Sequence, residues 1–328
     1  MIKLITTTII FLGLMLGSAN ADQKKIGFIY IGPPGDHGWT YMHDQGRQYM
    51  ESQLGDAVSS TYIENVPENA DAVRAIRKLA ASGHDLIFTT SFNYMDQTLE
   101  VAKEFPDVKF EHATGYMRAD NVATYGARFY EGRTISGHIA GHLTKTNTIG
   151  YIASFPIPEV VRGINAFYLA ASKVNPDIKI KIIWAFTWYD PGKEADAAKT
   201  LINQGADILV QHTDTFAPCQ EAEKAGVLAF GQASNQEEFC PNSHLTAIED
   251  VWGPYYADRA KAVVDGTWSS TDTWDGMDKG MVVMSPYNAK LMSSDLIQEA
   301  VAMEIALKDG SMHSFEGPIY NQAGELMV

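Results

Sequence analysis

Short apolar runs alternate with helical patterns along most of the chain. Ten runs predict strands, and they lie at residues 26–32, 59–66, 85–91, 108–115, 122–130, 148–155, 178–186, 207–213, 227–234 and 245–250. Between them, apolar residues recur three or four positions apart, as at Val160, Ile164, Phe167 and Ala171, which predicts amphipathic helices. Near-continuous apolar strands separated by helices indicate parallel sheets covered on both faces.

The pattern restarts in the middle of the chain. The stretch TIGYIASFPIPEVVRGINAFYLAA repeats the strand–loop–helix plan of KIGFIYIGPPGDHGWTYMHDQGRQYM, which predicts two similar α/β lobes. The C-terminal portion adds a helix at 253–268, a strand near 280–286 and a helix at 295–307, so we expect it to cross back and complete both lobes. The predicted lobes are 22–128 with 251–285, and 129–250 with 286–328.

The first 21 residues have the features of a secretory signal peptide. Lys3 precedes an apolar segment, and Ala19 and Ala21 offer small residues at the cleavage positions. No cysteine follows the apolar segment, so we expect no N-terminal lipid. The mature chain is therefore expected to begin at Asp22 and to be located in the periplasm.

The net charge excludes several classes of partner. The full chain carries −15, and loss of Lys3 with the leader makes the mature chain −16. A surface of this sign repels phosphate backbones and anionic head groups, so nucleic acid is not an expected partner. Cys219 and Cys240 remain in an oxidising compartment, where a disulfide between them is expected, although two buried thiols fit the sequence as well.

Polar and aromatic side chains gather where the predicted strands end. Ligands of open α/β sheets bind at the carboxyl ends of strands. The side chains placed there in this chain are Asp36, His37, Trp39, Ser91, Phe92, Asn93, Tyr94, Trp188, Tyr189, Asp190, His212, Asp214, Ser234 and Asn235. Because five strand ends are followed by polar and aromatic residues of this kind, we predict a binding site between the lobes.

Each predicted lobe has a tryptophan in an equivalent position, just after the end of a strand. Trp39 and Trp188 each follow a strand, which favours two aromatic faces around a flat ligand over local packing of each ring in its own loop. Asp36, Asp214 and Asn235 would supply the polar groups that orient a ligand. The alternative for these three is that they cap the helices that follow, as Asp and Asn commonly do.

The chain carries no strong catalytic or metal motif. It has no G-x-S-x-G nucleophile motif and no phosphate-binding P-loop motif, and GPPGDHG lacks the later glycine of a dinucleotide site. The segment HIAGH places His138 and His142 one helical turn apart. A zinc protease would need glutamate at Ile139, and no third ligand is evident. We therefore expect no enzyme activity, no cofactor and no metal.

Several longer segments resemble one family. The segments YGARFYEGRTISGHIAGHLT, GVLAFGQASNQ and LTAIEDVWGPYY are similar to the basic membrane protein family of ABC-transporter substrate-binding proteins, which includes purine nucleoside receptors. The resemblance extends from about Lys25 to the ending GPIYNQAGEL. It implies a type I periplasmic-binding-protein fold, with two Rossmann-like lobes joined by three crossings, a hinge and a ligand cleft between the lobes.

The resemblance also assigns roles to the two tryptophans. The first corner of the family usually reads D-x-S-F-N, and residues 36–40 fall on it, so Trp39 replaces a phenylalanine that stacks on a purine. A second stacking aromatic of the family precedes Asp-Pro by one residue, which matches Trp188 before Tyr189 and Asp190.

Departures from the family favour a nucleobase over a nucleoside. Ala233 occupies the place of an aspartate that holds ribose hydroxyls in the family, Asn235 replaces a second aspartate, and Asp250 replaces a lysine. We therefore expect an adenine-like ligand and an ABC permease of the inner membrane as the partner. The alternatives are a nucleoside-binding protein of the same type, or a ligand sensor that presents its closed form to a membrane receptor. The expected ligand-binding residues are Asp36, Trp39, Ser91, Phe92, Asn93, Tyr94, Trp188, Asp190, Asp214, Asn235 and Asp250.

Overall fold

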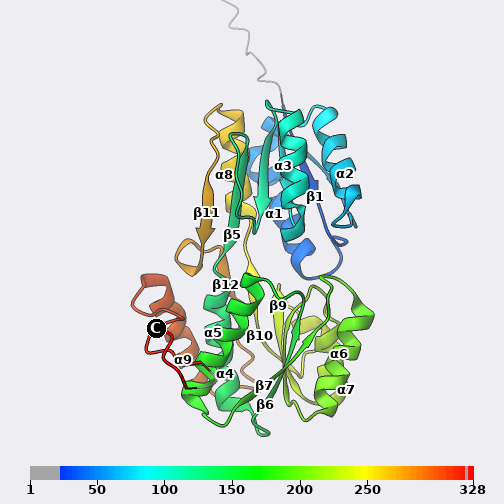
Figure 1. The fold of residues 1–328 in the computed structure, drawn as a ribbon. Coiled ribbons are helices and arrows are strands. Elements are labelled where there is room, and N and C mark those ends of the chain that lie inside the picture. The colour runs from blue at the N-terminus through cyan, green and yellow to red at the C-terminus, as the bar shows by residue number, and fades with distance from the viewer. Residues whose placement is uncertain (1–22, 322–323) are drawn as a thin grey trace, which may run out of the picture.

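The computed structural model describes residues 23–321 and 324–328, which form two α/β lobes joined end to end (Figure 1). The predicted leader at 1–21 lies outside the described residues. No described helix combines the length and the apolar character that a membrane span requires.

The first sheet has six strands, all parallel, in the order β11-β5-β4-β3-β1-β2. Apolar side chains alternate between its two faces. Phe28 packs with Tyr256 of α8 on one face, whereas Ile29 belongs to the cluster beneath α2 and α3 on the other. The elements are β1 (Lys24–Ile29), α1 (Trp39–Leu54), η1 (Gly55–Ala57), β2 (Val58–Ile63), α2 (Ala70–Ala81), β3 (Leu86–Thr89), η2 (Phe92–Tyr94), α3 (Met95–Glu104), β4 (Lys109–Ala113), β5 (Val122–Ala127), α8 (Gly253–Val264) and β11 (Asp272–Asp275).

The second sheet repeats this plan in the order β12-β10-β9-β8-β6-β7. Its one antiparallel pair joins β12 to β10. Its elements are α4 (Tyr130–Leu143), β6 (Thr148–Ala153), α5 (Pro158–Val174), β7 (Lys179–Trp184), α6 (Pro191–Asn203), β8 (Ile208–His212), α7 (Ala217–Ala225), β9 (Leu228–Ala233), η3 (Glu237–Phe239), β10 (His244–Asp250), η4 (Met277–Lys279), β12 (Val282–Met284) and α9 (Ser294–Asp309).

The chain passes between the two sheets three times. The passages follow β5, β10 and β11, so the C-terminal part does complete both sheets as predicted. The ten predicted strands and the two C-terminal helices are confirmed. The polar strand β11 was not predicted. The exact division into lobes stays a prediction, and one detail differs: β12 falls within the 251–285 segment that we assigned to the first lobe, yet it pairs with β10 of the second sheet.

Cys219 and Cys240 form a disulfide, with Cα atoms 5.7 Å apart. Cys219 lies in the first turn of α7, after β8, and Cys240 ends the short helix η3, after β9. The bond therefore joins the first turn of α7 to the end of η3, and the predicted pairing is confirmed.

Candidate functional site

A cavity lies where the carboxyl edges of the two sheets meet. The space not filled by atoms, including open space at its mouth, is about 360 Å³. Its lining comes from both lobes: Ile31, Trp39, Ser91, Phe92 and Thr114 from the first, and Glu159, Trp188, His212, Asp214 and Gln232 from the second. Most of these residues follow β1, β3, β6 and β8. Each pair of strands lies where the strand order of its sheet reverses, which is the usual ligand position in open α/β sheets.

Trp39 is held rigidly in the wall of the first lobe. It is the first residue of α1, and its Nε1 donates to the Thr90 carbonyl at 2.6 Å. Its ring meets His43 edge to face at 4.5 Å and Trp252 at 5.5 Å. Because one edge of the indole is bonded and the ring is packed from behind, the ring enters the cavity in a fixed orientation.

Trp188 belongs to the opposite lobe and is bonded across the interface. Its Nε1 lies 3.2 Å from both carboxylate oxygens of Glu68. The same carboxylate accepts from the Ser91 hydroxyl and from the Asn93 side chain at 2.9 Å. Phe155 packs against the indole at a centroid distance of 5.0 Å. Glu68 therefore connects the β3 loop to Trp188, a role that the sequence did not indicate.

Further contacts hold the lobes in a closed arrangement. The His37 carbonyl accepts from the Ser234 hydroxyl and from Nε2 of Gln236 at 3.4 Å. Gly38 lies directly against the Asp214 backbone, where a Cβ atom would be 1.9 Å from the carbonyl oxygen. Glycine is therefore required at position 38 in this arrangement.

The second lobe brings buried polar atoms to the cavity. Asp214 is 5 % exposed, and its Oδ2 has no hydrogen-bond partner among the described residues. Burial raises the pKa of Asp214 well above its usual value, and the nearby carboxylates of Asp36 and Glu194 raise it further. His212 places Nε2 3.4 Å from Glu159, and its Nδ1 also has no described partner.

Two further buried side chains, which do not line the cavity, also have polar atoms without a described hydrogen-bond partner. Arg133 is 1 % exposed; it donates to the Gln211 carbonyl at 2.7 Å and to the Gln232 side chain, while Nε and Nη1 have no described partner. Both carboxylate oxygens of Asp250 are likewise buried without a described partner. Burial raises the pKa of Asp250; Glu159 adds to this shift and Arg133 opposes it. Buried polar atoms normally have partners, so this cluster is suited to a polar ligand or to ordered water.

Glu194 positions the two loops that carry Trp188 and Asp214. One of its oxygens accepts from the Asp190 backbone at 3.0 Å, and the other accepts from the Thr215 backbone at 3.0 Å and its hydroxyl at 2.7 Å. Burial raises the pKa of Glu194 to about 7 despite these bonds.

Five predicted site residues line the cavity: Trp39, Ser91, Phe92, Trp188 and Asp214. Six do not belong to its lining. Asp36 caps α1, because its carboxylate accepts from the backbone of Gly38 at 2.8 Å, of Thr40 at 3.1 Å and of Tyr41 at 2.9 Å. Burial raises the pKa of Asp36 to about 6. These bonds agree with the capping alternative.

The other five occupy different environments. Asp190 caps α6, and the Asn235 side chain accepts from the Glu237 backbone at 2.9 Å. Tyr94 lies in the core and donates to the Val66 carbonyl at 2.5 Å. Asn93 is exposed and bonds Glu68, and Asp250 lies in the buried cluster described above. Ligand contact by these residues stays a prediction.

Sequence reasoning missed Ile31, Thr114, Glu159 and Gln232, and it noted His212 without assigning it a role. Glu159 is the second residue of α5, the helix that follows β6, and β6 is the counterpart of β1 in the repeated strand–loop–helix plan. The rule that ligands bind at the carboxyl ends of strands, which identified Trp39, would also have identified Glu159.

Comparisons with known proteins agree with this architecture. Residues 23–322 match the family of PnrA-like ABC transporter substrate-binding proteins. A purine-binding protein of Brucella abortus is 56% identical over 95% of this chain and 89% of its own length. A putative ABC transporter glucose-binding protein of Haloferax volcanii is 35% identical over 89% of this chain and 74% of its own.

Solved structures share the fold at low sequence identity. An ABC transporter solute-binding protein of Aeropyrum pernix superposes with a TM-score of 0.77 at 18% identity, covering 88% of this chain and 92% of its own. Another, from Conexibacter woesei, gives 0.71 at 22% identity and covers 89% and 100%. The predicted two-lobed binding-protein fold is confirmed, and this family and these structures are solute-binding proteins rather than enzymes.

Proposed function

Because the chain belongs to the PnrA-like family of ABC transporter substrate-binding proteins, we propose that it binds a purine nucleobase, adenine-like, for import. The relative named as purine-binding, 56% identical over most of both chains, supports the purine class. The leader expected at residues 1–21 and the disulfide support a location in the periplasm. The partner would be an ABC permease of the inner membrane.

The observation that carries the proposal is the pairing of Trp39 and Trp188 from opposite lobes in one cavity with the unpaired carboxyl of Asp214. Stacking of a base on an aromatic side chain contributes about 1–3 kcal/mol. With its pKa raised by burial, the carboxyl of Asp214 offers both a donor and an acceptor. Adenine presents donors and acceptors side by side on its edges, so one neutral carboxyl satisfies two of its atoms.

The free base fits better than the nucleoside. Ala233 is buried at the end of β9 and has no side-chain atom that could bond a ribose hydroxyl. The N9–H of adenine exists only in the free base, because the glycosidic bond replaces it in adenosine. A nucleoside would leave an acceptor that faces N9 without a partner, at a cost of about 1–3 kcal/mol.

Closure of the two lobes provides the mechanism. Ligand contacts from both walls add to the interlobe bonds of Glu68 with Trp188 and of His37 with Ser234. A ligand that binds only the closed form shifts the population toward it, and the closed form is then the species that the permease recognises.

Calorimetric titration with adenine, adenosine and glucose tests the proposal. We expect adenine to bind with micromolar or tighter affinity, about 8 kcal/mol or more, and adenosine to bind about tenfold or more weakly. Adenosine binding as tightly as adenine would refute the nucleobase assignment. Binding of glucose without binding of either purine would refute the purine class.

A further inference from the structure

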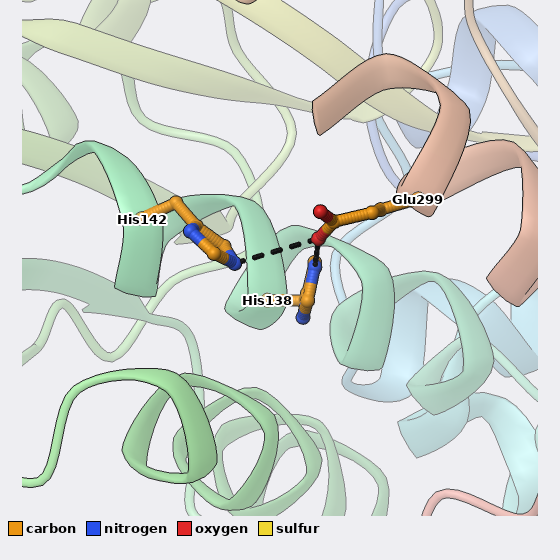
Figure 2. A group of neighbouring side chains, drawn as sticks. All are labelled: His138, His142 and Glu299. Atoms are coloured by element: carbon orange, nitrogen blue, oxygen red, sulfur yellow. Dashed lines mark hydrogen bonds and ion pairs between the residues drawn. The ribbon is translucent and has the colours of Figure 1, made fainter. Parts of the chain in front are cut away.

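Two histidines of α4 and one glutamate of α9 meet on the second lobe (Figure 2). Nε2 of His138 is 2.8 Å from the Glu299 carboxylate, and Nε2 of His142 is 3.6 Å from the same oxygen. The ligand atoms of all three residues lie within 4.8 Å of one another. The sequence supplied only the two histidines. The third group comes from a helix more than 150 residues later, which α4 reaches only in the folded chain.

The helix that carries the histidines is firmly packed. Most of α4 is buried, and His138 and His142 are exceptions, with side chains 20 % and 40 % exposed. Gly137 and Gly141 lie against α5, where added Cβ atoms would be 2.2 Å and 2.8 Å from backbone oxygens of Phe167 and Ala171. This close helix contact fixes α4, so the two imidazoles leave it on one face, one turn apart, beside Glu299.

We propose that His138, His142 and Glu299 bind a divalent transition metal ion, with Zn²⁺ as its best-matched representative. Two imidazoles and one carboxylate are a common ligand set for zinc, and a water completes four-coordination. Ligand atoms about 2.1 Å from zinc in a tetrahedron are about 3.4 Å apart. The two distances to Glu299 lie on either side of that value, so small side-chain rotations suffice. The acidic protein, with a net charge of −15, also attracts cations to its surface.

The metal would fasten α9 to α4. Glu299 is the acceptor that already joins the two helices through His138, and α9 follows the last crossing of the chain. An ion that binds this arrangement but not the unfolded chain stabilises the fold by mass action. Neither α4 nor α9 contributes a residue to the lining of the cavity between the lobes, and His138, His142 and Glu299 are separate from the buried cluster that contains Arg133. Among the described residues, no other cluster offers three such ligands.

The test uses untagged, chelator-treated protein and ZnCl₂, with calorimetry for binding and thermal unfolding for stability. Both cysteines are in the disulfide, so no described thiol competes for zinc. We expect one Zn²⁺ per chain and an increase in Tm of a few degrees at a Zn²⁺ concentration about 100 times Kd. With Co²⁺ in place of zinc, visible ligand-field bands should report the low-coordinate site.

Single-ligand variants and a matched control decide the assignment. His142→Ala and Glu299→Gln should each weaken Zn²⁺ binding at least about tenfold and remove the Co²⁺ bands. His313→Gln, at an exposed histidine outside the cluster, should bind like the wild type. Tm without metal shows that each variant folds. Absence of stoichiometric Zn²⁺ binding by the wild type, or equal affinity in the ligand variants, would overturn the proposal. Adenine binding does not enter either outcome.

Discussion

The two walls of the cavity differ in how their polar atoms are satisfied. On the wall of the first lobe, the indole N–H of Trp39 is bonded to Thr90 and the Ser91 hydroxyl to Glu68, and the cavity also meets the apolar side chains of Ile31 and Phe92. On the wall of the second lobe, Asp214 and His212 keep buried atoms without a described partner. The first wall is suited to stacking, whereas the second combines the stacking ring of Trp188 with groups that can form hydrogen bonds.

This difference predicts that different groups of the cavity determine affinity and selectivity. A preformed aromatic face accepts any flat ring, because stacking depends little on the identity of the ring. Unpaired buried groups discriminate more sharply, because a ligand that fails to pair them leaves their desolvation uncompensated. We therefore expect affinity to depend mainly on the two indoles and on closure, and selectivity on the polar groups of the second wall.

The largest effect is expected from preventing the walls from meeting. Gly38→Ala places a methyl group about where the Asp214 carbonyl oxygen lies, 1.9 Å from its Cβ, and no side-chain rotation relieves the overlap. Ligand affinity should fall by about a thousandfold or more, about 4 kcal/mol. Gly35→Ala is the matched control, because nothing lies within 4 Å of its added Cβ. Calorimetry measures the ligand affinity of both variants, and circular dichroism verifies that they fold. Wild-type affinity in Gly38→Ala would show that binding does not require this closed arrangement.

The buried acids of the second wall should make stability depend on pH. The pKa of Glu194 rises from 4.5 to about 7 on folding, so the folded state holds a proton that the unfolded state releases above pH 4.5. The free energy of unfolding should therefore fall as pH rises from about 4.5 to about 7, by up to about 3 kcal/mol at about 1.4 kcal/mol per pKa unit.

Glu194→Gln removes the ionisable group and should flatten that fall. Denaturant unfolding of both proteins at several pH values measures it. An equally steep decline in the variant would assign the pH dependence to other groups.

Removing either stacking ring should weaken binding less than blocking closure does. Trp39→Ala and Trp188→Ala should each reduce adenine affinity by about 1–3 kcal/mol. Trp188→Ala also removes the interlobe bond to Glu68, so its loss should be the larger of the two. Wild-type affinity in both variants would exclude the stacking arrangement.

The smallest effect on affinity, and the clearest on selectivity, is expected at the second wall. Asp214→Asn preserves volume and, like the neutral carboxyl, offers one donor and one acceptor, so adenine should lose less than about 0.5 kcal/mol. Asp214→Leu removes both groups at similar volume, and adenine should lose about 0.5–1.5 kcal/mol for each hydrogen bond. Unsubstituted purine, which lacks the amine at C6, should lose less in Asp214→Leu, because it makes at most one of the two bonds. A uniform loss across both purines would show that Asp214 does not read the ring edge.

The sequence predicted well what depends on local pattern. Strand and helix periodicity located the ten strands, and the rule that ligands bind at strand ends located Trp39, Trp188 and Asp214. Asp36 shows the limit of this rule, because one residue type serves both as a helix cap and as a ligand group. The three backbone bonds of Asp36 show the capping role, which depends on how the loop turns, and ligand contact by Asp36 stays a prediction.

Long-range partners could not be predicted in the same way. Glu68 accepts a hydrogen bond from Trp188 of the other lobe. Glu299 is bonded to His138, although it lies in α9, which follows the last passage of the chain between the sheets. Neither glutamate lies in a local motif, and surface glutamates are common. Their positions follow from the strand order and from lobe closure, which a single sequence does not encode in any periodic pattern.

A crystal structure of the protein with adenine tests the central claim most directly. We predict the purine between the indoles of Trp39 and Trp188, with the Asp214 carboxyl within hydrogen-bonding distance of its edge and a hydrogen-bond acceptor facing N9–H. Adenine outside this cavity, or in it without contact to either indole, would contradict the account.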